Sequence, residues 1–178
     1  MNEAPLMLGV SGLRGIVGSS LTPDVASRFS AAFGSHLFER LGAQAKTGKA
    51  PTRRPVVVVG RDGRLGGEIV QSSAINGLIS VGCDVAIADL IMTPTLGVLV
   101  DQLQADGGLM VTASHNPQDW NGMKPVLRAL GAKPGAPSAG APEKAQADQL
   151  LARYREGRIL WRKADLFGSV LSDPVRPE

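Results

Sequence analysis

The sequence is poor in cysteine and in aromatic residues, and each scarcity excludes a class of protein. Cys83 is the single cysteine among 178 residues, which rules out an internal disulfide framework and a cysteine-based zinc cluster. It lies beside the strand-like residues 85–88, so we expect a buried, inert thiol. Four Phe, two Trp and one Tyr are too few for an aromatic platform that stacks nucleic-acid bases.

Long apolar runs are also missing. No segment approaches the ~20 apolar residues of a membrane helix, so we expect no membrane partner. The first ten residues lack the cationic and apolar regions of a secretory leader, so the expected location is cytoplasmic. Hydrophobic residues make up 43% of the chain, an ordinary globular proportion. The length suits one well-formed core rather than two.

The formal net charge is only +3, yet one stretch is basic with no acidic residue inside it. Because Gly, Ala, Pro and Thr separate its cations and no aromatic residue accompanies them, this stretch predicts a solvated loop and no nucleic-acid partner. Its members are Arg40, Lys46, Lys49, Arg53 and Arg54.

Strand-like and helix-like segments alternate along the chain, which indicates an α/β fold: a layered sheet flanked by helices on both faces. A β-branched run without polar alternation, residues 55–59, is typical of a strand covered on both faces. Thr22-Pro23-Asp24 is a helix start, and Gly42 offers its end. The remaining expected elements are strands at 84–88, 108–111 and 123–127, and helices after Arg64, from Thr93 and over 143–154.

Several details of these elements are specific expectations. Ile69 belongs to the apolar stripe expected of the second helix. Pro125 lacks a backbone donor, so its strand position should be at an edge or a bulge. Residues 131–142 are rich in Gly, Ala and Pro and predict a flexible connection. The segment after Gly157 either packs back on the domain or contacts something outside it.

Polar residues gather in loops that follow the apolar strands, and the segment Val111 to Lys124 is the densest. Ser114 could act as a nucleophile or as a phosphate carrier. His115 is its neighbour in sequence, and adjacent side chains on an extended loop point in opposite directions. His36 lies on the first helix as surface or core filler, and no G-x-S-x-G motif occurs. Serine-hydrolase chemistry is therefore disfavoured.

Phosphate binding fits the loops better. Arg14 is flanked by glycines, whose backbone N–H groups can converge on an anion while a guanidinium grips its oxygens. Arg61 and Arg64 flank Asp62 in another glycine turn, and Lys124 ends the polar segment. No Walker-type motif and no G-x-G-x-x-G occurs, so nucleotide binding lacks support.

Three motifs taken together resemble the α-D-phosphohexomutase superfamily, which includes phosphoglucomutase, phosphomannomutase and phosphoglucosamine mutase. The resemblance covers residues 8–127 and involves only the first of the family's four domains. It implies that residues 1–157 are the phosphoserine domain and 158–178 a tail toward a second domain. The motifs are Ser11-Gly12-Leu13-Arg14-Gly15, Gly60-Arg61-Asp62-Gly63-Arg64, and Thr112-Ala113-Ser114-His115-Asn116-Pro117 with Asn121-Gly122-Met123-Lys124.

The resemblance also implies an activity. Ser114 would carry a phosphoryl group, bind Mg²⁺ through it, and exchange it with O1 and O6 of a hexose phosphate through a bisphosphate intermediate. Arg14, Lys124 and His115 match catalytic residues. Ser11, Asp62, Arg64, Asn116 and Asn121 match substrate-loop or supporting positions.

Other parts of the family pattern are missing. The metal loop D-G-D-x-D-R and the sugar and phosphate loops of later domains do not occur. We therefore expect the fragment alone to be inactive and to bind Mg²⁺ weakly or not at all, its partners being a hexose phosphate and the remaining domains. Glucose, mannose and glucosamine phosphates all stay open as substrates. The alternative is a stand-alone, non-catalytic module that binds sugar phosphates or a protein.

Overall fold

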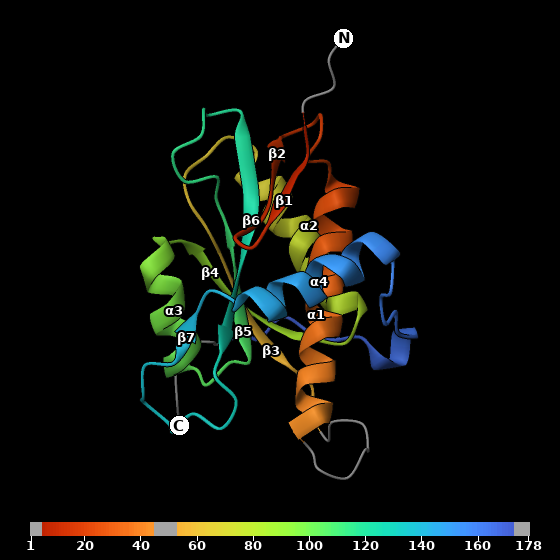
Figure 1. The fold of residues 1–178 in the computed structure, drawn as a ribbon, viewed down its shortest axis with the longest axis vertical. Helices are drawn as coiled ribbons and strands as arrows, with labels where there is room; N and C mark the ends of the chain where they lie inside the picture. Colours follow the sequence, from red (N-terminus) through yellow and green to blue (C-terminus); the bar gives the residue numbers. More distant parts are fainter. Residues whose placement is uncertain (1–4, 45–52, 173–178) are drawn as a thin grey trace.

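A mixed β-sheet forms the centre of the fold (Figure 1). The computed structural model describes residues 5–44 and 53–172. The strands are β1 (Met7–Gly9), β2 (Gly12–Ile16), β3 (Val56–Arg61), β4 (Asp84–Leu90), β5 (Gly107–Val111), β6 (Trp120–Arg128) and β7 (Ala139–Gly140).

The strand order is β1-β2-β6-β5-β3-β4, with β7 beside β6. β3 runs parallel to β4 and β5, whereas β6 runs antiparallel to β5, β2 and β7. The carboxyl ends of β3 and β5 therefore meet the beginning of β6 at one edge of the sheet. That edge is where functional loops gather in open α/β sheets.

Helices cover both faces of the sheet, as the sequence predicts. Figure 1 shows α1 (Pro23–Gln44), α2 (Gly67–Ser80) and α4 (Lys144–Glu156) on one face, and α3 (Thr93–Gln102) on the other. A short 3-10 helix, η1, spans Ala164–Leu166. No helix in the described ranges is long and apolar enough to cross a membrane.

The valines of β3 show why this strand has no polar alternation. Val57 and Val59 belong to the core beneath α1 and α2, while Val58 belongs to the core beneath α3. All three are fully buried. A strand with a helix layer on each face needs apolar side chains at every position, which is what the run at 55–59 indicates.

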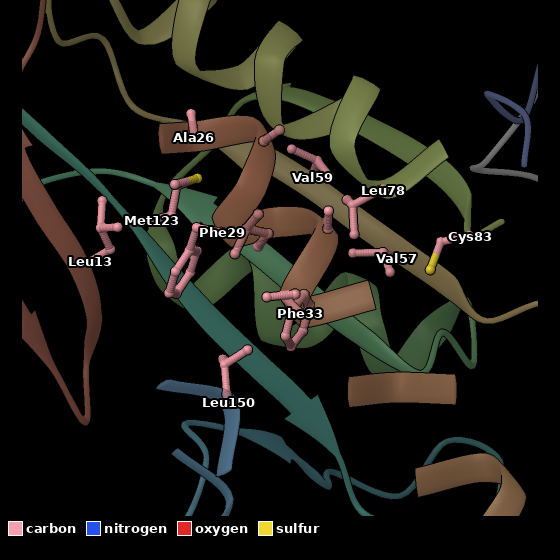
Figure 2. Packing of buried hydrophobic residues seen from close by; sticks show 14 of the residues in the cluster. Leu13, Ala26, Phe29, Phe33, Val57, Val59, Leu78, Cys83, Met123 and Leu150 are labelled. Atoms are coloured by element: carbon pink, nitrogen blue, oxygen red, sulfur yellow. The ribbon is translucent and has the colours of Figure 1, made fainter. Parts of the chain in front are cut away.

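The larger core is built around α1. Phe29 and Phe33 are fully buried and point from α1 toward the sheet (Figure 2), and burying each such ring stabilises the fold by ~1.5–3 kcal/mol. Phe29 meets Tyr154 of α4 edge to face, with ring centroids 5.6 Å apart. α1 and α2 pack backbone to backbone, because a Cβ at Gly77 would lie 2.2 Å from the carbonyl oxygen of Ser27.

The predicted helix start is confirmed: the Val25 amide donates to Thr22 Oγ1 at 3.3 Å. The helix passes Gly42 and ends at Gln44. The hairpin of β1 and β2 was not expected, since its short strands show little apolar periodicity. Arg14 consequently lies on a strand rather than in a loop.

One detail of the predicted packing is wrong. Ile69 is 57% exposed, because it lies in the first turn of α2, on the side away from the sheet. Pro125 lies in β6, an inner strand, but its own position is a local edge. It pairs with β5 on one side only, since pairing with β2 stops at Met123 and pairing with β7 starts at Leu127.

The segments on either side of α4 are more ordered than their composition indicates. Residues 131–142 include β7, and Asp101 accepts the backbone amides of Ser138 and Ala139 at 2.9 and 3.1 Å. The segment after Gly157 packs back on the domain, since Ser169 and Leu171 bond the backbone of Val85 at 2.8 Å each. Trp161 and Phe167 nevertheless stay exposed there.

The basic stretch is confirmed as exposed at Arg53 and Arg54. Arg40 differs, because it belongs to α1 and is half-buried. Lys46 and Lys49 lie outside the described residues. Cys83 is fully buried, and burial raises the pKa of its thiol, which confirms the inert cysteine.

His36 gives the fold a pH dependence. It is 3% exposed on α1, and burial, followed by the charges of Arg40 and Arg153, lowers its pKa to about 4. Between pH 6.5 and about 4 the unfolded chain therefore binds a proton that the folded chain does not. The free energy of unfolding should fall by ~2–3 kcal/mol as the pH drops through this window. Urea unfolding of His36→Gln at pH 7.0 and 4.5 should show a smaller fall than wild type. His115→Gln, at the exposed histidine, is the control, and equal falls in all three proteins would contradict the assignment.

Candidate active site

The site is formed by two loops at the carboxyl edge of the sheet: residues 112–119 between β5 and β6, here called the serine loop, and the turn 62–66 after β3. Their proximity follows from the parallel pairing of β3 and β5, which sets Arg61 opposite Val111. The Asp62 amide continues the ladder and donates to the Val111 carbonyl at 3.1 Å. Both loops therefore begin at the same level of the sheet.

Arg64 holds the serine loop through its backbone. Its guanidinium donates to several carbonyl oxygens on one side of the loop, and the rigid fork of donors suits such convergence. Its side chain is only 11% exposed, and its bonds to the carbonyls of Asn116 and Trp120 are partly buried, whereas those to Ser114 and Pro117 are exposed. The acceptors are the carbonyls of Ser114, Asn116 at 2.9 Å, Pro117 at 2.7 Å and Trp120 at 3.2 Å.

Asp62 connects this clamp, the Arg64 guanidinium, to Thr112, two residues before Ser114. Its Oδ2 lies 3.4 Å from Arg64 Nε and accepts the hydroxyl of Thr112 at 2.5 Å. Thr112 Oγ1 in turn accepts the Ser114 amide at 3.0 Å. The chain of contacts fixes Ser114 in the left-handed region, at φ 59°. A non-glycine residue adopts that conformation only when its surroundings impose it.

The first cation of the site, Arg14, comes from β2. It pairs with Gly122 of β6, and its Nη1 donates to the side-chain oxygen of Asn116 at 3.3 Å. Gly122 makes this possible, since a Cβ there would lie 2.9 Å from Arg14 Cγ and 2.3 Å from the Leu13 carbonyl oxygen. Any larger residue would displace Arg14 from the serine loop.

The second cation, Lys124, lies two residues beyond Gly122 on β6. Because Gly122 pairs with Arg14, Lys124 and Arg14 lie on the same face of the sheet. Burial lowers the pKa of Lys124, and the positive charges of Arg14 and Arg64 lower it further, while Asp62 opposes them. A lysine with a lowered pKa loses its proton more easily and can therefore exchange protons with a substrate hydroxyl. The three cations Arg14, Arg64 and Lys124 outnumber the carboxylates of Asp62 and Asp119, so the region has a net positive charge.

The structure brings together most of the residues that the sequence indicates. Ser114 and His115 are both exposed at the serine loop, and the described contacts do not link their side chains to each other. Asn116 is anchored by Arg14 and Arg64. These placements agree with a loop that presents Ser114 to an incoming molecule.

Two of the residues that the sequence indicates do not lie at the exposed surface of the serine loop. Asn121 is fully buried, and its Oδ1 accepts the Gly122 amide at 2.9 Å, so it supports β6 from inside. Ser11 lies in the turn between β1 and β2, and no hydrogen bond within the described ranges joins it to the serine loop. The sequence analysis names Thr112 within the serine motif but gives it no role; its signal is a hydroxyl two residues before a serine, a spacing that lets it accept that serine's amide.

A metal ion would need more ligands than this region supplies. Within residues 5–44 and 53–172 no three His, Cys, Asp or Glu side chains are grouped so that they could hold one. The nearest carboxylate, Asp62, already serves Thr112 and Arg64. Because Mg²⁺ favours several oxygen ligands, these residues alone do not fit it.

Comparisons with known proteins agree with this geometry. The family model of phosphoglucomutase/phosphomannomutase, alpha/beta/alpha domain I, matches residues 5–138. A phosphoglucomutase/phosphomannomutase of Thermococcus kodakarensis is 41% identical over 118 residues, 66% of this chain and 24% of its own. A phosphoglucosamine mutase of Leuconostoc mesenteroides is 41% identical over 116 residues, 65% of this chain and 24% of its own.

The fold is similar as well. The crystal structure of a phosphoglucomutase/phosphomannomutase family protein from Burkholderia thailandensis superposes with a TM-score of 0.63 at 30% identity, over 93% of this chain and 33% of that one. This chain thus spans about a quarter of the length of the curated relatives and a third of that structure. The chain belongs to the phosphoglucomutase/phosphomannomutase family, as its α/β/α domain I.

Proposed function

We propose that this chain is the phosphoserine-bearing domain of a phosphohexomutase, an enzyme that interconverts hexose 1-phosphate and hexose 6-phosphate through a bisphosphate. The observation that carries the proposal is the serine loop: Ser114 is exposed, in a strained conformation, on a loop that Arg14 and Arg64 bind, and burial together with these two cations lowers the pKa of Lys124. A residue that only formed a turn would need neither the Arg64 clamp nor the surrounding cations.

Phosphoryl transfer depends on positioning and on neutralising the charge that spreads over the phosphoryl oxygens. In the proposed step the bond between Ser114 Oγ and phosphorus breaks while a sugar hydroxyl forms a new bond to phosphorus. The hydroxyl proton leaves to a base, and the serine oxygen takes up a proton. The bisphosphate then turns round and returns its other phosphoryl group to Ser114.

Each cation has a separate role that follows from its position. Arg14 is held against Asn116 at the serine loop, where it can bind phosphoryl oxygens bidentately. Lys124 has the lowered pKa expected of a proton-exchanging group, and His115 is exposed next to Ser114. Arg64 binds backbone carbonyls, so its role is to position Ser114.

The remaining parts of the site must come from elsewhere. We expect Mg²⁺ to bind the phosphate on Ser114 only when further domains contribute carboxylates, and the hexose to be bound largely by those domains. Leu90 and Met92, beside the turn 62–66, are 61% and 73% exposed, as expected of side chains that another domain covers. By itself the chain should show no steady-state mutase turnover.

The first test joins residues 1–178 to the three later domains of the Thermococcus kodakarensis relative. The joined protein should acquire one phosphate on incubation with hexose 1,6-bisphosphate, detectable by intact mass, and should interconvert hexose phosphates. Ser114→Ala should take up no phosphate and lose at least about 10³-fold in kcat/KM, because the carrier is gone. Ser72→Ala, at an exposed serine of α2, should behave as wild type. Turnover that survives Ser114→Ala would reject the phosphoserine.

The second test concerns the clamp. Arg64→Ala removes the donor shared by the serine-loop carbonyls, so amide hydrogen exchange at residues 113–118 should speed up. In the joined protein kcat should drop by roughly 10²-fold, the cost of a misplaced reacting group. Arg155→Ala, at an exposed arginine of α4, is the matched control. Unchanged exchange in Arg64→Ala would show that the loop is held by other contacts.

A further inference from the structure

A second group of cations lies at the opposite edge of the sheet from the serine loop. There a cavity of about 200 Å³ opens between the last turns of α1, the start of β5 and the end of β6. Its polar lining consists of three arginines and one aspartate, together with the backbone of the turn 129–132 that follows β6. These side chains are Arg40, Arg53, Arg128 and Asp106.

The aspartate of the cavity is already fully used. Arg53 grips Asp106 with both Nη atoms at 2.7 Å each, and Asp106 Oδ2 also accepts the Val56 amide at 2.9 Å. Such a bidentate pair neutralises one arginine. Little of the Asp106 charge is left to compensate the two other guanidinium groups.

Those two groups, Arg40 and Arg128, are bonded mainly to neutral carbonyls. Arg40 Nη2 donates to the Arg128 carbonyl at 3.2 Å, and Arg128 Nη2 donates to the Ala132 carbonyl at 3.0 Å. Arg128 Nε reaches Asp101 only at 3.8 Å. Among the described residues no carboxylate comes within 4.0 Å of Arg40.

Arg40 is also withdrawn from water. It is half-buried, and burial lowers its pKa. The charge of Asp106 raises the pKa, but by less than burial lowers it. Its charge is therefore held in a partly desolvated place without a close counter-ion from the described part of the chain, which is unfavourable unless an anion can enter. A plain surface arginine would instead extend into solvent, as Arg155 does on α4.

The dimensions restrict the ligand. The cavity is smaller than the ~300–1,000 Å³ typical of drug-sized ligands, but several times the ~30 Å³ that one water occupies in the liquid. Two arginines that line so small a cavity suit a tetrahedral oxyanion, whose oxygens accept paired N–H donors.

We propose that this cavity is a second anion site, which binds the phosphate group of a small molecule between Arg40 and Arg128. The group could arrive as inorganic phosphate or on a phosphorylated sugar, which share this chemistry. The site lies at the other edge of the sheet from Ser114, so a ligand there would leave the serine loop free. The proposal does not depend on the mutase activity.

The test is a titration of the 178-residue chain, labelled with nitrogen-15, at constant ionic strength in chloride. Inorganic phosphate and hexose 6-phosphate are titrated separately, and amide shifts are followed at Gly131 and Ala132 for the cavity and at Gly63 and Ser114 for the serine loop. Saturable shifts of Gly131 and Ala132 are expected. A lower dissociation constant for inorganic phosphate identifies the free ion as the ligand, and a lower dissociation constant for hexose 6-phosphate identifies a sugar phosphate.

Arg40→Met keeps most of the side-chain stem and removes the charge, so the dissociation constant at the cavity should rise at least about tenfold. Arg128→Met is the second variant, in case Arg40→Met perturbs α1. Arg155→Met is the matched control for loss of one positive charge, and Lys124→Met should weaken only the shifts at the serine loop. Linear shifts at Gly131 and Ala132, or saturable shifts unchanged in both cavity variants, would overturn the proposal.

Discussion

The conformation of the serine loop depends on the Arg64 guanidinium more than on any other group. A loop of eight residues that leaves a sheet would ordinarily satisfy its carbonyls with water and sample several conformations. Here one largely buried arginine donates hydrogen bonds to carbonyls on one side of the loop, in place of water. Ordering is thus achieved through the backbone, which leaves the side chains of Ser114 and His115 exposed.

The position of Arg64 depends on the sheet beneath it. β3 and β5 are parallel neighbours, so the turn after one strand and the loop after the other rise side by side. β6 then runs antiparallel between β5 and β2. Lys124 lies on the same face of the sheet as Arg14, and Gly122 of β6 leaves room there for the Arg14 side chain. Arg64, Ser114 and the cations Arg14 and Lys124 are consequently supplied by segments far apart in sequence, all fixed by strand pairing.

The serine loop and the arginine-lined cavity are both positively charged, but their side chains are arranged differently. At the serine loop Arg14 and Arg64 bind the loop that bears an exposed hydroxyl, and the Asp62 carboxylate lies against Arg64 and Thr112. At the other edge of the sheet Arg40 and Arg128 border a small cavity in which the single carboxylate is occupied by Arg53. The first arrangement suits transfer of a phosphoryl group, and the second suits only binding of an anion.

The sequence by itself determined the α/β class, most helices and long strands, and the position of the polar serine loop. These follow from local patterns: the valine run of β3, the Thr22 start of α1, and the polar residues after β5. The tertiary structure decided what local patterns do not encode. The short hairpin that places Arg14, the unpaired position of Pro125 and the exposure of Ile69 all depend on which strands and helices become neighbours. Thr112 and the carbonyl-binding role of Arg64 likewise appear only when the pairing of β3 with β5 brings Asp62 between them, because a hydrogen bond depends on distance in space and not on separation along the chain.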